Sequence, residues 1–322
     1  MKTVIFQIFF KGTGSASCCS IALVFILMAA IASAQGLERQ PDDVPRPDDP
    51  AGSHSFDTLR TNAIPVVSGL EDARSLVASP SGEFIITEAG AGRIRICTLE
   101  PGFLNAEKVE FSCSSTHYVT LPDAGRPDGL ALVLDTFTGL TDGEHGTVKV
   151  LDDQYRTMRT LSVPSWVPGA GVFKPSDLTA NEFGEIFVLD GSNRRLYHFN
   201  ANGDYLQHFE LSQTYRPNRL HYHNESLFIS DPGSGNVIVL ADSGRELARI
   251  GRFPNLERVI VRDDTIWVIS GYVLHIFSIT GTHLANKMPF RVDGIIRDLT
   301  WIENRMFLLT SGSLYFWDGF EQ

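Results

Sequence analysis

Charged residues gather at one recurring place in this chain, immediately before six apolar residues that lie 39 to 54 positions apart. The six pairs at this place are Arg74-Ser75, Asp128-Gly129, Ser176-Asp177, Asn218-Arg219, Glu257-Arg258 and Arg297-Asp298. Arginine side chains form paired hydrogen bonds with planar anions such as carboxylates and sulfates. The four arginines therefore predict binding of an anionic small molecule, a uronic-acid carbohydrate or a partner protein. The same charges can instead pair with one another and hold neighbouring repeats in register, and the sequence leaves this interpretation open.

An aromatic residue in a proline-rich segment is the second candidate for recognition. Trp166 lies between Pro164 and Pro168 in the segment 162–173. A tryptophan at a loop tip is a common binding anchor, although it can equally fill a gap between repeats. The predicted ligand-binding residues are therefore Arg74, Asp128, Asp177, Asn218, Arg219, Arg258 and Arg297, flanked by Trp166.

Other acidic residues are better explained by structure than by chemistry. Glu88, Asp190 and Asp231 each end an apolar run and recur with the repeat, so we expect them to accept hydrogen bonds from turn amides. The segment 135–146 holds Asp142, Glu144 and His145 among glycines, but this spacing matches no standard calcium loop. We interpret it as a flexible surface excursion.

The repeat itself predicts the elements that position these residues. Residues 174–209 read as four short strands separated by turns, and residues 216–250 are a weaker copy. The apolar residues that begin each copy are Leu76, Leu130, Leu178, Leu220, Val259 and Leu299. Six four-stranded units predict an all-β, six-bladed β-propeller. The last unit has only three strands, so an N-terminal strand such as Thr58–Val67 should complete the last blade and close the ring.

The middle unit resembles the NHL repeat family. The resemblance lies in Pro175-Ser176-Asp177-Leu178, then Val188-Leu189-Asp190, then Asn193-Arg194-Arg195-Leu196. It is good in units three and four, fair in unit one and faint elsewhere. Such propellers include binding modules, lyases and lactonases, so the resemblance implies the fold and leaves the function open.

A shorter resemblance suggests a metal site. Arg126-Pro127-Asp128-Gly129 is similar to a motif of gluconolactonase-like propellers in which the aspartate binds a divalent metal, and Asn218 resembles a second oxygen ligand. Arg219 stands where that family has glycine, Arg74 stands where it has an early glutamate, and the two motifs come in the opposite order. The expectation is no cofactor, with one divalent metal such as calcium at Asp128 and Asn218 as the alternative.

Histidines give the chain a second, weaker resemblance to an enzyme class. Propeller lyases that cleave peptidyl-hydroxyglycine hold zinc with histidines from several blades. His221 and His223 alternate on one predicted strand and could supply half of such a site. Because no first strand of another unit offers a partner, a half-buried strand face is the favoured interpretation.

The N-terminal region predicts export. Residues 1–34 have Lys2 and Lys11, an apolar run over 21–31 and a small-residue cleavage site, which is typical of a signal peptide. An uncleaved anchor is the alternative. Residues 35–55 are rich in proline and acid and predict a disordered linker, which leaves 56–322 for the propeller. The expected location is secreted or periplasmic, within the cell envelope, with no membrane span after cleavage.

Cysteine and charge narrow the class further. Outside the leader only Cys97 and Cys113 remain, so we expect them to form a disulfide in an oxidising compartment, with two separate buried thiols as the alternative. The formal charge is −11, and nucleic acids repel such a field. The sequence therefore predicts an exported, monomeric binding or scaffold propeller that binds no nucleic acid. The alternative is a metal-dependent lactonase or lyase acting at the same channel mouth.

Overall fold

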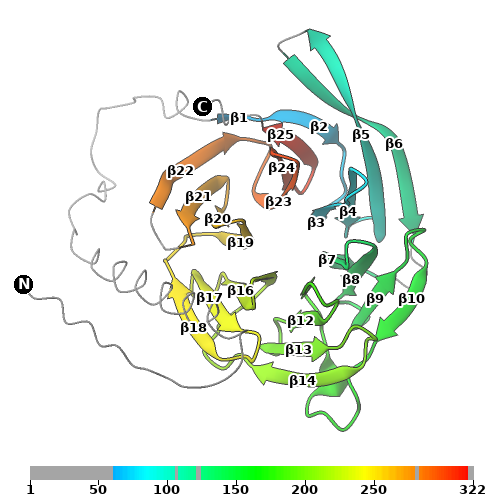
Figure 1. The fold of residues 1–322 in the computed structure, drawn as a ribbon, viewed down its shortest axis with the longest axis vertical. Coiled ribbons are helices and arrows are strands. Elements are labelled where there is room, and N and C mark those ends of the chain that lie inside the picture. Colours follow the sequence, from blue (N-terminus) through cyan, green and yellow to red (C-terminus); the bar gives the residue numbers. More distant parts are fainter. Residues whose placement is uncertain (1–60, 106–107, 121–124, 280–282, 318–322) are drawn as a thin grey trace, which may run out of the picture.

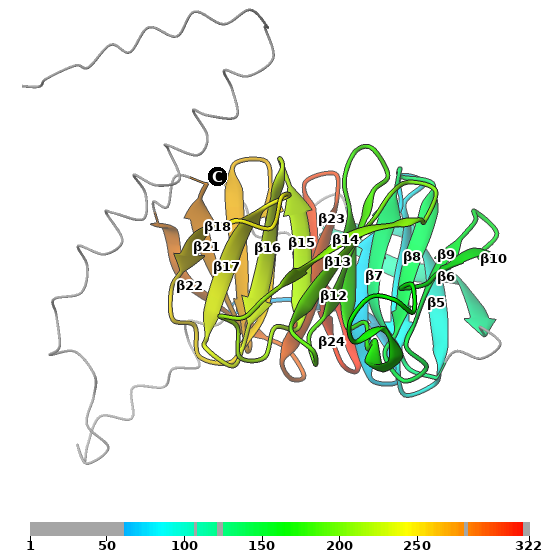
Figure 2. The same ribbon diagram turned by 90° about the horizontal axis from the view of Figure 1, so that it is seen from below.

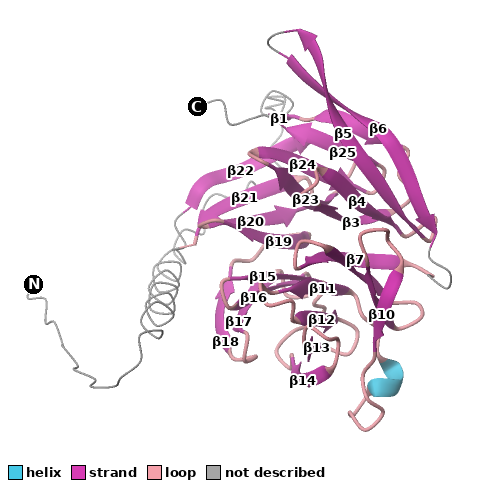
Figure 3. Ribbon diagram, turned by 45° about the vertical axis from the view of Figure 1, so that its right-hand side comes forward, coloured by secondary structure: helices cyan, strands magenta, loops and turns pink. Residues whose placement is uncertain are grey.

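The structure is a computed structural model that describes residues 61–105, 108–120, 125–279 and 283–317. Six sheets surround a central channel (Figure 1). Each contains four antiparallel strands that form one blade, and one sheet gains a short fifth strand in parallel. Nearly all regular structure is strand, and the described helix is one short turn, η2 (Ala170–Val172), on an outer loop (Figure 3). The chain is therefore an all-β, six-bladed propeller, as the repeat predicts.

Each blade uses consecutive strands that run from the channel to the outer edge. Blade 1 is β3 (Ala73–Ala78), β4 (Glu83–Glu88), β5 (Arg93–Asn105) and β6 (Lys108–Thr120). Blade 2 is β7 (Pro127–Val133), β8 (Phe137–Asp142), β9 (Thr147–Leu151) and β10 (Thr157–Leu161). Blade 3 is β11 (Asp177–Ala180), β12 (Ile186–Asp190), β13 (Arg195–Phe199) and β14 (Tyr205–Glu210). Blade 4 is β15 (Arg219–His223), β16 (Ser226–Asp231), β17 (Asn236–Ala241) and β18 (Glu246–Ile250). Blade 5 is β19 (Leu256–Arg262), β20 (Thr265–Ser270), β21 (Val273–Ser278) and β22 (His283–Arg291).

Blade 6 combines the two ends of the described chain. Its inner strands are β23 (Ile296–Ile302), β24 (Arg305–Thr310) and β25 (Ser313–Trp317), and its outer strand is β2 (Ile64–Ser68), which pairs antiparallel with β25. This confirms the predicted closure. The preceding two-residue strand β1 (Thr61–Asn62) pairs in parallel with β22 of blade 5 instead. The N-terminal segment therefore contacts two blades (Figure 1).

Apolar side chains fill every junction between blades. Six hydrophobic clusters are present in the described chain, and each combines buried residues of two adjacent blades. The apolar residue that begins each repeat lies in one of these clusters and is buried, as Leu76 at 2% exposure and Val259 at 0% illustrate. The blades are thus held face to face, and the innermost strands present one edge to the channel.

Two sets of loops define the two faces of the disc, which Figure 2 shows edge-on. The loop face is formed by the connections that lead into the innermost strands, over 69–72, 125–126, 162–176, 211–218, 251–255 and 292–295. The turn face is formed by the connections between first and second strands, over 79–82, 134–136, 181–185, 224–225, 263–264 and 303–304. Antiparallel strands alternate between these faces, so the charged pairs at the start of each inner strand all lie toward the loop face.

The recurring acids hold the loop face together. The predicted bond to an amide of the following turn occurs at Asp190, whereas Glu88 and Asp231 bind amides of the connection before the inner strand. Glu88 accepts a hydrogen bond from Glu71 N at 3.0 Å, and Asp190 accepts one from Lys174 N at 3.0 Å. Asp190 also accepts from Asn193 N in its own turn at 3.0 Å, while Asp231 accepts from Arg216 N at 2.7 Å. Each acid therefore joins two loops of the same face.

Blade 2 corrects the interpretation of 135–146 as a surface excursion. Residues Phe137–Asp142 form β8, the second strand of the blade, and Asp142 is its recurring acid. Asp142 accepts hydrogen bonds from Gly125 N and from the amides of Glu144 and His145. Gly139 lies inside this strand, where a Cβ atom would be 2.4 Å from the Leu178 side chain of blade 3. The position requires glycine because the two blades pack closely there, although a glycine in the sequence suggests a turn.

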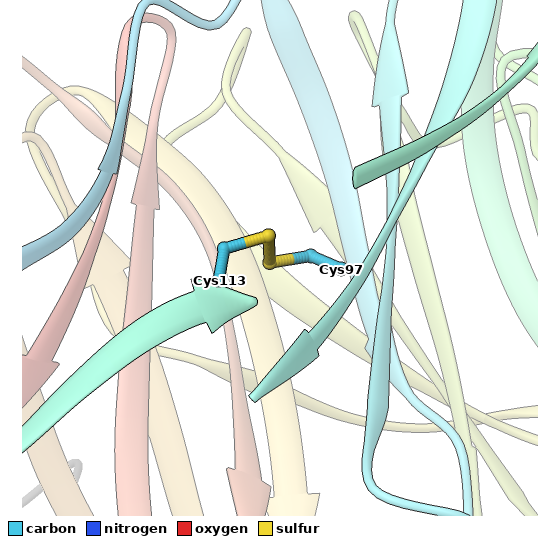
Figure 4. The surroundings of a disulfide bond; sticks show 2 residues. All are labelled: Cys97 and Cys113. Atoms are coloured by element: carbon cyan, nitrogen blue, oxygen red, sulfur yellow. A yellow bond between two sulfur atoms is a disulfide. The ribbon is translucent and has the colours of Figure 1, made fainter. Parts of the chain in front are cut away.

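Blade 1 has a long outer hairpin that extends beyond the ring (Figure 1). Its strands β5 and β6 are joined by the predicted disulfide between Cys97 and Cys113, whose Cα atoms are 5.5 Å apart (Figure 4). Both cysteines belong to the hydrophobic cluster shared by blades 1 and 6. The disulfide therefore fixes the base of the hairpin beside the closure of the ring, and its presence is typical of an oxidising compartment.

The predicted signal peptide at 1–34 and the linker at 35–55 lie outside the described residues. Within the described ranges, no helix is long and apolar enough to cross a membrane.

Candidate functional site

The channel is crossed at the loop face by side chains from the position just before each repeat. Asp177, Arg219, Arg258 and Asp298 are buried there, with exposures of 0%, 7%, 6% and 1%. Blades 1 and 2 place only Ser75 and Gly129 at this position. The two arginines of blades 4 and 5 can therefore extend into the space that the small residues leave.

Arg219 spans the channel from blade 4 to blades 1 and 2. Its Nη1 lies 3.0 Å from Asp128 Oδ1, and its Nη2 donates a hydrogen bond to the Arg74 carbonyl at 3.1 Å. The contact with Asp128 is an ion pair. Arg219 Nη1 also lies 4.0 Å from Asp177 Oδ1 of blade 3. One side chain thus connects four blades.

Arg258 makes the equivalent crossing from blade 5. Its Nε lies 3.0 Å from Asp298 Oδ1 of blade 6, and its Nη1 lies 3.6 Å from Asp177 Oδ2 of blade 3. The same Nη1 donates to Ser75 Oγ of blade 1 at 3.3 Å. Together with Arg219 it closes the channel at the loop face with paired charges, and we call Asp128, Asp177, Arg219, Arg258 and Asp298 the channel network.

Two of the three aspartates of the channel network, Asp177 and Asp298, also bind backbone. Asp177 Oδ2 accepts from Leu220 N of the next blade at 2.8 Å, and Asp298 Oδ2 accepts from Leu76 N at 2.9 Å. Burial raises the pKa of Asp177, although Arg258 and Arg219 oppose that shift. Burial alone would lower the pKa of Arg219, but the nearby carboxylates raise it above its ordinary value. Arg219 therefore stays charged, and the contacts of both arginines hold the blades in register.

The remaining predicted arginines are paired as well. Arg74 Nη2 lies 2.7 Å from Asp72 Oδ2, and Arg297 Nη1 lies 2.9 Å from Glu257 Oε2. Both arginine side chains are 29% exposed, so they reach the surface of the loop face. Each of the four arginines that predict an anion site thus already has a carboxylate partner. An incoming anion must compete with that partner.

The residues around Asp128 do not fit a divalent metal. Arg219 Nη1 lies beside Asp128 Oδ1, where a metal ion bound by that oxygen would have to be. The guanidinium and a metal ion at that distance would repel each other strongly. Asn218 Oδ1 is buried without a hydrogen bond but belongs to the same strand connection as Arg219. In the described part of the chain, no three or more His, Cys, Asp or Glu side chains form a group that could hold a metal.

The two histidines of β15 do not converge on a shared site. His221 Nε2 lies 2.9 Å from the Val261 carbonyl, and His223 Nε2 lies 3.0 Å from Asn224 Nδ2. His221 lines the channel, whereas His223 is not among the residues that line the cavity there. Neither is arranged as a zinc ligand in the described structure.

Trp166 lies away from the channel network. Its ring is 5.6 Å from Tyr205 in an edge-to-face arrangement, and Tyr205 is on β14, the outermost strand of blade 3. The side chain is 74% exposed. The loop that carries it therefore covers the outer wall between blades 2 and 3, and the structure does not place Trp166 beside the other predicted ligand-binding residues.

Sequence reasoning did not predict a cavity that lies deeper in the channel. It has a volume of about 320 Å³ and is lined by all six innermost strands. Arg258 and Asp298 form its closed end, and Ala78, Ala180 and Arg262 line it where their strands end toward the turn face. The alternation of His221 and His223 with Tyr222 indicates that one side of this strand differs from the other. This periodicity does not show whether the strand faces a filled channel or a cavity.

Comparison with known proteins supports the fold. No family model matches the chain, and no curated protein matches it. A gluconolactonase from Xanthomonas campestris superposes with a TM-score of 0.62 at 16% identity, covering 85% of this chain and 96% of that one. A streptogramin B lyase gives 0.57 at 12%, covering 79% and 95%. Virginiamycin B lyase from Staphylococcus aureus, in an inactive form with quinupristin, gives 0.55 at 15%, covering 76% and 80%.

These likenesses concern architecture. The superpositions show that the chain shares the propeller fold of these lactonase and lyase structures. At identities of 12% to 16% they show the fold alone, and a shared fold does not imply a shared activity. The NHL likeness of units three and four stays a sequence-based prediction.

Proposed function

We propose that this chain is an exported binding propeller that recognises a partner protein across its loop face. The observation that carries the proposal is the pairing of the predicted arginines. Arg74, Arg219, Arg258 and Arg297 each lie within 3.0 Å of a carboxylate. The channel mouth is thus a closed surface of balanced charge, which suits a protein partner better than a free anion.

Apolar side chains on the same face supply the second half of the argument. Tyr215 is 76% exposed, Tyr272 is 47% exposed and Ile295 is 40% exposed. Tyr215 lies in the connection that leads to Arg219, and Ile295 lies in the one that leads to Arg297. Tyr272 follows Gly271, whose carbonyl accepts from Ile296 N at 2.8 Å, so Tyr272 and Ile295 are close together.

Exposed aromatics within a charged rim are typical of protein interfaces. Arg126 and Glu71 add charged side chains to this rim, with exposures of 56% and 58%. The disulfide and the N-terminal leader support an exported location for such a complex.

The test compares two faces of one molecule. The chain and its variants are tagged, expressed in the organism that encodes it, and purified from the cell envelope fraction for mass spectrometry. The loop-face variant is Tyr215→Ala with Tyr272→Ala. The matched control is Phe183→Ala, because Phe183 is 70% exposed on the turn face. We expect one protein to be retained by wild type and control and to be lost from the loop-face variant.

Two results would contradict the proposal. Equal retention by all three proteins would place the interface elsewhere. Saturable binding of a sulfated or uronic-acid polysaccharide to purified wild type, lost in Arg74→Ala with Arg297→Ala, would show that the ligand is an anion instead of a protein.

A further inference from the structure

The cavity in the channel has a shape and chemistry that the loop face lacks. We infer that it binds a small, largely apolar molecule with one N–H or O–H donor, which His221 Nδ1 accepts. The inference goes beyond the proposed function, because the cavity reaches the turn face and shares no exposed residue with the partner surface. The two can therefore be tested separately.

The walls of the cavity combine apolar and polar side chains, and the apolar part is somewhat larger. Leu76, Leu130, Leu178, Leu220 and Ile260 line it together with small residues such as Ala131 and Ala180. Its volume of about 320 Å³ falls at the lower end of the 300–1,000 Å³ that is usual for small-molecule sites. Apolar walls of this extent favour a ligand whose body is a ring or a branched hydrocarbon.

One end of the cavity is closed by the channel network. Arg258 and Asp298 lie there, and their charges are already neutralised by each other at 3.0 Å. At the other end, the Arg262 guanidinium stacks 5.2 Å from the centre of the Trp301 ring. A ligand must therefore enter from the turn face, past an aromatic and a cation that can cover it.

His221 is the polar group best placed to orient a ligand. A carbonyl oxygen can only accept, so the contact of His221 Nε2 with Val261 O at 2.9 Å places the proton on Nε2. In the neutral ring, Nδ1 then carries a lone pair. Among the described residues, no hydrogen bond to His221 Nδ1 occurs. Nδ1 is also not fully buried, unlike the partnerless polar atoms elsewhere in the channel network. Nδ1 is therefore accessible to a donor in the cavity.

The protonation state supports the same role. Burial lowers the pKa of His221 to about 4, and the positive charge of Arg258 acts in the same direction. The imidazole is thus neutral near pH 7, and Nδ1 can only accept there. A ligand with a donor gains a hydrogen bond there, whereas one with only acceptors finds none at this atom.

Indole and indene provide a matched pair of probes, because they share size and shape and only indole has an N–H. Binding is measured by isothermal titration calorimetry or ligand-observed NMR. We expect wild type to bind both and to prefer indole by about three- to tenfold, the usual worth of one neutral hydrogen bond. The preference should be the same at pH 7 and at pH 8.

Variants separate the donor from the cavity. In His221→Leu, indole should bind no better than indene, while His223→Leu on the same strand should keep the preference. Ala180→Phe should abolish binding of both probes, since Ala180 lines the cavity. Circular dichroism and thermal unfolding check that each variant folds. If His221→Leu is unfolded, the imidazole ¹⁵N signals of wild type supply the readout, because indole must shift Nδ1 more than Nε2.

Three results would overturn the inference. They are equal affinity of wild type for indole and indene, an unchanged preference in His221→Leu, and no saturable binding of either probe to wild type.

Discussion

Gly129 of blade 2 lies against Asp177 of blade 3 so closely that a Cβ atom on the glycine would be 2.4 Å from Asp177 Oδ1. The other oxygen of Asp177 accepts from Leu220 N of blade 4 at 2.8 Å. A missing side chain in one blade thus allows an acid of the second to bind the backbone of the third. The Pro-Asp-Gly sequence at 127–129 therefore serves the assembly of the ring.

Substitution of this glycine tests that contact. Gly129→Ala should lower the free energy of unfolding by about 1–3 kcal/mol, because the new methyl group must displace a buried carboxylate. Urea unfolding followed by tryptophan fluorescence measures the change. Gly171→Ala is the control, since nothing lies within 4 Å of a Cβ atom there. A Gly129→Ala protein as stable as this control would refute the role of the contact.

The channel network should be far more important for stability than surface ion pairs. Arg258→Met leaves Asp177 and Asp298 buried without their shared partner, which typically costs about 3–5 kcal/mol. Arg156→Met removes a pair with Asp152 whose arginine is 69% exposed, and it should leave the unfolding midpoint unchanged. Similar unfolding curves for both variants would contradict this prediction.

Acid should reveal the contribution of Glu88. Burial alone would raise the pKa of Glu88, but hydrogen bonds from Arg93, Glu71 N and Arg95 lower it below 4.5. A lowered pKa in the folded state means stability that is complete above about pH 4.5 and lost as the pH falls through the folded value. The difference in unfolding free energy between wild type and Glu88→Gln should therefore be constant above pH 5 and shrink below it. A difference that grows on acidification would contradict the prediction.

Reduction should destabilise the hairpin of blade 1. The disulfide joins residues 16 positions apart, and closing a loop of that length contributes about 3 kcal/mol in the chain-entropy account. We expect dithiothreitol, or Cys97→Ala with Cys113→Ala, to lower the free energy of unfolding by that amount. Reductant should not affect the double variant further, and a wild type unaffected by reductant would disprove the prediction.

Metal removal tests the enzyme alternative. Because Arg219 is paired with Asp128, dialysis against EDTA should leave the melting temperature unchanged. Elemental analysis of protein purified without chelator should find less than one equivalent of calcium, zinc or manganese. One tightly held equivalent that disappears in Asp128→Ala would support a metal-dependent lactonase or lyase instead.

The sequence predicted the ring because the repeat reports directly on packing. Apolar starts such as Leu178 and Leu220 recur in all six blades, and acids such as Asp190 and Asp231 end the second strand in blades 1 to 4. The exception is informative. Gly139 in β8 has the residue type of a turn, and only the nearby Leu178 side chain explains it. A glycine required by a neighbouring blade cannot be distinguished in one sequence from a glycine required by the backbone.

The candidate site was predictable in composition but not in pairing. The sequence places Arg219 and Asp128 on one ring, yet they are 91 positions apart and come from blades that are not adjacent. Their contact depends on how far an arginine reaches across the channel, which no local pattern encodes. Trp166 shows the same limit, because a loop insertion does not indicate which side of the disc it covers.

The closure of the ring also determines how the molecule would carry a mechanical load. The described chain enters through β1, which pairs with β22, and continues into β2, which pairs antiparallel with β25. Ile64 at the start of β2 pairs with Phe316 near the end of β25, so both ends of the described chain leave this ladder on the same side. Tension between the two ends would therefore open the hydrogen-bonded pairs one after another, beginning at the ends. A molecule pulled in this way would open first at the blade that closes its ring.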